Sequence, residues 1–121
     1  MNTVIHKERQ SYTKYDNEHY LLYINEQEAI FTEQESKVEC PGYSYAGDMT
    51  DGGTLVAASN VTDENRRSAF IAGLIATKYS IDAQIAILAN GKDTEQHETE
   101  YREFEQFRKE CKAAIDNLLT R

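Results

Sequence analysis

The stretch from Thr62 to Leu119 constrains the fold most, because nearly half of the chain there has the residue pattern of helices. Thr62 can accept hydrogen bonds from the free amides at a helix start, and the two acids after it suit the positive end of the helix dipole. Residues 63–77 carry apolar side chains at spacings of one, three and four, which predicts a first helix. The change from strand to helix spacing falls near Val61.

Two further helices are expected. Ser80 can cap a short helix over about 81–89. We expect this helix to bury its apolar residues, which are Ile81, Ile85 and Leu88. Asp93 or Thr94 can cap a third helix that extends to Leu119.

The third helix carries an apolar stripe that its neighbour is too short to cover. At about 1.5 Å per residue the third helix is roughly 39 Å long and the second about 14 Å. An uncovered stripe is a docking surface, so we expect a protein interface there and an oligomer or larger assembly. The expected interface residues are Tyr101, Phe104, Phe107, Arg108, Ile115 and Leu118. The alternative is that the N-terminal sheet of the same chain covers the stripe.

The first half of the chain favours β-strands. Residues 19–24 are rich in aromatic and branched side chains on both strand faces, which predicts a strand covered on both sides. Residues 29–32 resume this pattern after a polar link, so the two segments predict an antiparallel hairpin. Residues 1–17 are mostly polar, with Tyr12 and Tyr15 as the large apolar anchors, and we expect an N-terminal arm that orders only when it packs on something.

A second hairpin is expected after Pro41, the only proline, which marks a break. Residues 43–45 alternate as a strand does, residues 47–53 contain an Asp-Gly turn signal, and residues 54–58 resemble a short strand. Most tyrosines lie in the first 45 residues, which suits either an interface or the edges of a small sheet.

The length of 121 residues fits one compact domain. The segments predict an α+β fold with an N-terminal antiparallel hairpin or small sheet, followed by three helices of which the last is long. We expect residues 18–121 to form a single domain, mainly strand over 18–59 and helical over 60–121.

The chain is acidic, with a formal net charge of −8 at pH 7. Phosphate backbones and anionic membrane surfaces repel such a chain, so we expect neither nucleic-acid nor membrane partners. No signal-peptide core is visible at the start, and we expect synthesis and assembly in a cytoplasm. Cys40 and Cys111 are then expected to be reduced, buried thiols.

No residue pattern indicates catalysis or a bound cofactor. The three histidines are scattered, and His97 with Tyr101, one helical turn away, lacks a carboxylate on a second element. Residues 48–53 lack the alternating acids of a calcium loop and the lysine of a phosphate loop, so they indicate an ordinary turn in which aspartates bind nearby amides. We therefore expect no catalytic, metal or cofactor-binding residues and a protein that is not an enzyme.

Five segments of the chain carry a family resemblance. They are Asp51–Thr54, Asn65–Ile75, Lys78–Asp82, Ile85–Leu88 and Glu103–Lys112. They combine a helix, a Tyr-Ser cap, a short helix and a helix with the motif Arg-x-x-Cys-Lys. In this pattern residues 51–119 resemble small virion proteins of the tail, fibre or head decoration, encoded by phages and prophages of gut bacteria. The resemblance implies a virion component without catalytic residues.

We therefore expect a non-enzymatic structural or interaction subunit of a bacteriophage particle, located in the virion and assembled in the host bacterial cytoplasm. Its partners would be copies of itself or other virion proteins. Two alternatives remain open: a cytoplasmic regulatory protein that binds a host protein, and a small-ligand-binding enzyme of unfamiliar fold. Convergent buried polar groups in a well-formed pocket would favour the enzyme.

Overall fold

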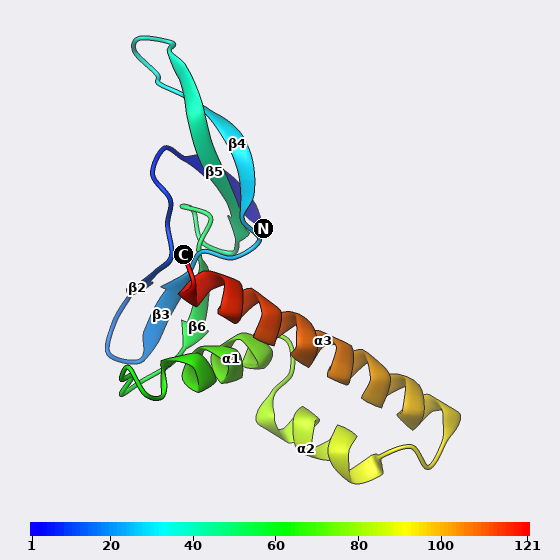
Figure 1. Cartoon of the computed structure of the whole chain (residues 1–121). Coiled ribbons are helices and arrows are strands. Elements are labelled where there is room, and N and C mark those ends of the chain that lie inside the picture. The colour runs from blue at the N-terminus through cyan, green and yellow to red at the C-terminus, as the bar shows by residue number, and fades with distance from the viewer.

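The computed structural model describes residues 1–121 and confirms the α+β class (Figure 1). Two antiparallel sheets of three strands each precede three helices. The elements are β1 (Asn2–His6), β2 (Tyr12–Lys14), β3 (His19–Leu22), β4 (Gln27–Thr32), β5 (Glu39–Gly47), β6 (Thr54–Ala57), α1 (Arg66–Ala76), α2 (Ile81–Asn90) and α3 (Glu95–Leu119). In Figure 1 the β4–β5 hairpin projects at one end of the molecule, and α2 extends with the start of α3 at the other.

The first sheet, here called the hairpin sheet, has the strand order β1-β5-β4. β4 pairs with β5 along its whole length, whereas β1 pairs with β5 only over residues 43–47. Pro41, which was expected to mark a break, instead lies inside β5. The strand tolerates this proline because β1 does not reach it, so the missing N–H costs no bond on that side.

The second sheet, here called the helix-covered sheet, has the order β2-β3-β6. Both faces of the chain at β3 are covered, as its apolar pattern predicted. Leu22 and Ile24 lie in the main core with residues of α1 and α3. Leu21 and Tyr23 face the other way and form a smaller core with Tyr45 of the hairpin sheet. This smaller core joins the two sheets.

Both expected hairpins are wrong. Residues 19–24 and 29–32 belong to different sheets, because the chain leaves β3 through a turn at Asn25, which has a φ of 58°, and β4 then pairs with β5. Residues 43–47 pair with β1, while residues 54–57 pair with β3. A short polar link suits both a tight hairpin and a crossing between two sheets, so the local pattern did not distinguish them.

Residues 1–17 do not form a separate arm, since β1 and β2 add one strand to each sheet. β1 is an edge strand with exposed or half-buried side chains, so it lacks the apolar face by which a strand is recognised. Tyr12 packs edge to face on Phe70, with ring centroids 5.2 Å apart. Tyr15 is exposed.

α1 and α3 pack together over the helix-covered sheet and enclose the main core. Gly73 allows α1 to approach β6 closely, because a Cβ at this position would lie 2.6 Å from the carbonyl oxygen of Ala57. Cys111 of α3 is a free thiol in this core, and burial raises its pKa to about 11. It therefore acts as a small apolar side chain, whereas Cys40 is only half-buried.

The helix starts largely follow the expected capping residues. Ser80 and Thr94 each accept a hydrogen bond from the amide three residues further on, both at 3.1 Å. α1 begins at Arg66, later than expected, and a turn closed by reciprocal hydrogen bonds between Thr62 and Asn65 precedes it. The Thr62 amide donates to Asn65 Oδ1 at 2.7 Å, and the Asn65 amide donates to Thr62 Oγ1 at 3.3 Å.

Candidate interaction surfaces

The expected interface on α3 is largely covered by the chain itself. Phe104, Ile115 and Leu118 are at most 1% exposed and belong to the main core. The prediction that these three side chains face another chain is therefore wrong. The prediction compared the length of α3 with that of α2 alone. In the structure α1 and the helix-covered sheet also pack on the apolar stripe of α3 and bury it.

The other three expected interface residues are half-buried at the margin of this core. Phe107 packs on Tyr79, with ring centroids 5.7 Å apart. Arg108 forms an ion pair with Glu105 at 2.9 Å. Tyr101 has the ammonium group of Lys92 over its ring, 5.2 Å from the centroid. These side chains leave only a narrow accessible margin along α3.

The exposed apolar side chains gather instead on α2. Ile81, Ile85 and Leu88 are 65%, 59% and 54% exposed, so the expectation that they are buried is wrong. Their spacing of four and three residues places them on one face, while Ile87 packs against the main core. The sequence of α2 is apolar nearly all round, so periodicity alone did not show which side would face α3. We call the three exposed residues the α2 face.

No single helix combines the length and the apolar composition of a membrane span. α1 and α2 meet that test only as a pair, and they are bent by 85° at the break between them.

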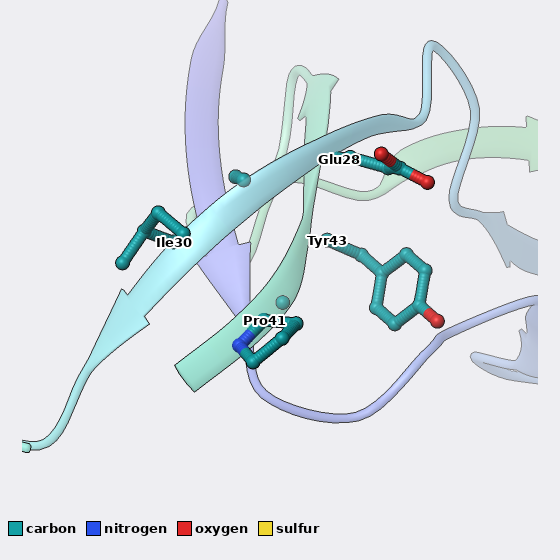
Figure 2. Close-up of a pocket in the computed structure, with 6 residues that line it drawn as sticks. Glu28, Ile30, Pro41 and Tyr43 are labelled. Atoms are coloured by element: carbon teal, nitrogen blue, oxygen red, sulfur yellow. The ribbon is translucent and has the colours of Figure 1, made fainter. Parts of the chain in front are cut away.

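A shallow hollow lies on the hairpin sheet (Figure 2). It has a volume of about 330 Å³, and the cross-strand pairs Glu28–Tyr43 and Ile30–Pro41 border it. Arg9 lies over the ring of Tyr43, 5.6 Å from its centroid. Ile30 is 57% exposed, so this face of the hairpin presents a large apolar side chain to solvent.

A partly buried ionic cluster closes the junction between the two sheets. Glu26 accepts two hydrogen bonds from Arg9, at 2.8 and 3.1 Å, and one from the Tyr45 hydroxyl at 2.7 Å. The hydrogen bonds from Arg9 hold the pKa of Glu26 below its usual value against the effect of burial. Arg121 Nε lies 3.5 Å from the same carboxylate, and its Nη1 donates to the carbonyl oxygen of Gln10 at 3.1 Å.

A second polar group lies beside this cluster. The Tyr23 hydroxyl donates to Asp51 Oδ2 at 2.6 Å, and the amide of Gly53 donates to Asp51 Oδ1 at 2.9 Å. The latter bond confirms the expected turn at residues 48–53. The rings of His6, Tyr23 and Tyr45 pack edge to face, with centroids 5.6 to 5.9 Å apart. These groups find their partners within the chain, which is typical of a cluster that holds two sheets together.

The Tyr23–Asp51 bond predicts a stability change at high pH. Burial, followed by the bond to Asp51, raises the pKa of Tyr23 to about 12. Because this value lies above the unfolded one near 10, the contribution of Tyr23 is complete below pH 10 and is lost as the pH rises towards 12. Tyr23→Phe should therefore lower the free energy of unfolding at pH 7, and the difference from the native chain should shrink above pH 11.

Urea unfolding at a series of pH values measures this difference. Tyr15→Phe, on an exposed side chain, is the matched control and should stay within about 0.5 kcal/mol of the native chain. A difference for Tyr23→Phe that is the same at pH 7 and pH 11.5 would show that folding does not raise the pKa of Tyr23.

Comparison with known proteins gives no match: no family model, no curated protein and no solved structure matches this chain. In the structure no three histidine, cysteine or acidic side chains converge as metal ligands would.

Proposed function

We propose that this protein is a non-enzymatic structural or interaction subunit of a bacteriophage particle, part of the tail, a fibre or the capsid surface. The observation that carries the proposal is the α2 face. Three large apolar side chains on one side of a short helix are improbable on a free surface, since burying each would gain roughly 1.5–3 kcal/mol. The resemblance of residues 51–119 to small virion proteins is the reason for proposing a phage particle as the assembly.

The polar clusters support this proposal over an enzyme of unfamiliar fold. A ligand-binding site needs polar groups that converge on an accessible pocket. Here Glu26, Asp51 and Arg121 point into the sheet junction and bind groups of their own chain. The hollow on the hairpin sheet is shallow, and Glu28 is its one carboxylate. A host-directed regulator would have a similar surface, so an experiment has to separate these two classes.

Mass spectrometry of purified particles makes that separation. Particles are prepared from a lysate of the bacterium whose phage or prophage encodes the chain, and the protein is counted relative to the major capsid protein. A virion subunit gives a fixed ratio that survives density-gradient purification. A protein that stays in the cleared lysate and is absent from the particles contradicts the proposal and favours the regulator.

A charge on the α2 face should prevent incorporation without unfolding the chain. Ile85→Glu places a carboxylate in the centre of the face, and the fold should persist because this side chain is already mostly exposed. If the face contacts a neighbouring subunit of the particle, losing one buried apolar side chain should reduce incorporation about ten-fold or more.

Ala113→Glu is the matched control, because it adds the same charge at an exposed position of α3. Complementation of a deletion phage with either variant, followed by quantification in purified particles, compares the two. Equal incorporation of both variants would exclude the α2 face as the contact.

A further inference from the structure

β4 presents an open edge of the hairpin sheet. The sheet order β1-β5-β4 leaves one side of β4 without a neighbouring strand, and Figure 1 shows this side facing away from the body. Four strands lie at sheet edges, and β4 is the longest of them, with six residues against five in β1, four in β6 and three in β2. A long edge with unpaired backbone groups is a template for another strand.

The hydrogen-bond pattern shows which backbone groups are free. The amide of Glu33 donates to the carbonyl oxygen of Val38 at 3.0 Å, and the carbonyl oxygen of Glu33 accepts from the Lys37 amide at 3.0 Å, so the backbone groups of Glu33 bond across the hairpin. Residues whose backbone groups bond to the partner strand alternate along an antiparallel ladder with residues whose groups point away from it. The N–H and C=O groups of Glu28, Ile30 and Thr32 therefore point away from β5, towards solvent.

The sequence of β4 is self-complementary around Ile30. An antiparallel copy with Ile30 opposite Ile30 of the second copy aligns all three outward-pointing residues, with Glu28 opposite Thr32 of the second copy. On the other face Ala29 lies opposite Phe31 of the second copy, a small side chain beside a large one. A register centred on Glu28 would instead place two carboxylates opposite each other, which is destabilising.

We propose that two copies of this chain pair through their β4 edges in this register, forming a continuous six-stranded sheet. Three outward residues on each strand give about six backbone hydrogen bonds across the two-fold axis. The pairing also covers the exposed Ile30 beside the hollow of Figure 2. The contact is isologous, so it closes at a dimer and leaves both α2 faces free. The β4 pairing goes beyond the proposed function, because two copies can be tested for it in solution whether or not the chain enters a virion.

Sedimentation equilibrium of the full chain over a concentration series tests the pairing. The native chain should show a monomer–dimer equilibrium, and Ile30→Pro should shift it to monomer at every concentration. Proline at this position removes an outward N–H and leaves the bonds to β5 in place. Ile85→Glu on α2 is the control and should dimerise as the native chain does. A native chain that is monomeric throughout, or a dimer that Ile85→Glu abolishes and Ile30→Pro preserves, overturns the proposal.

Lysine substitutions at Glu28 and Thr32 test the register without relying on a proline variant. Thr32→Lys places a lysine opposite Glu28 of the second copy at two symmetric sites, and should tighten the dimer about two- to thirty-fold. Glu28→Lys alone should leave the dissociation constant nearly unchanged. Glu28→Lys combined with Thr32→Lys apposes like charges and should weaken the dimer below the native affinity. Additive effects of the two substitutions would overturn this register.

Discussion

Replacing Phe104 by alanine should lower the free energy of unfolding by about 3–5 kcal/mol, the range for phenylalanine lost from a packed core. Phe104 is 1% exposed and packs edge to face on Tyr79, with ring centroids 5.0 Å apart. α1 and α3 pack on each other and on the helix-covered sheet, which limits how far they can move. The cavity left by the missing ring would therefore be filled only in part. Urea unfolding followed by far-UV circular dichroism measures the loss.

Gln106→Ala is the control, since it changes an exposed position of the same helix and should stay within about 0.5 kcal/mol of the native chain. The comparison also separates the two roles considered for the α3 stripe. If Phe104 served an interface between chains, Phe104→Ala would leave the monomer as stable as the control and weaken only an assembly. That result would contradict a place for Phe104 in the core of the monomer.

The features that sequence predicted are local ones. Helix caps act within one turn, so Ser80 and Thr94 located two helix starts correctly. The division into a strand half and a helical half also follows from side-chain spacing, and the α+β class with it. Residues 19–24 correctly predicted a strand covered on both sides, because both of its faces carry apolar side chains.

Strand pairing was not predictable, because it depends on contacts between distant segments. β1 pairs with β5 across some forty residues, and nothing in its own sequence indicates that partner. The α2 face was misjudged because α2 is apolar on several sides, so its rotation follows from how Ile87 packs on the core. The apolar stripe of α3 is likewise buried in part by α1, and the comparison of the lengths of α2 and α3 did not consider α1.

The ionic cluster had no signal in the sequence at all. Glu26 lies in a polar link that resembles a turn, and Arg121 follows α3 at a position where charges usually face solvent. The contact between Arg121 and Gln10 joins residues 111 positions apart. The two sheets and the end of α3 must meet before these groups come together, so no local sequence pattern could predict the cluster.

Removing the guanidinium group of Arg121 should therefore lower the free energy of unfolding about as much as Phe104→Ala does. Its side chain is 4% exposed, and its groups donate to the carbonyl oxygens of Gln10 and Tyr23 and to the Asn117 side chain. Burial lowers the pKa of Arg121, and the nearby Glu26 carboxylate counteracts this effect. Arg121→Met keeps the apolar stem but leaves these acceptors unpaired in the sheet junction. The expected loss is about 2–6 kcal/mol, because each of the two carbonyl oxygens left without a donor costs about 1–3 kcal/mol.

Arg67→Met provides the matched control for urea unfolding. Arg67 pairs with Asp116 at 2.7 Å, but both side chains are more than half exposed, so its loss should cost no more than about 1 kcal/mol. Adding Glu26→Gln to Arg121→Met should recover little of the loss, because Glu26 keeps its two hydrogen bonds from Arg9 when Arg121 is replaced. Equal effects of the two Arg→Met substitutions would mean that water reaches Arg121 and that the junction between the sheets is held by the aromatic rings of Tyr23 and Tyr45 instead.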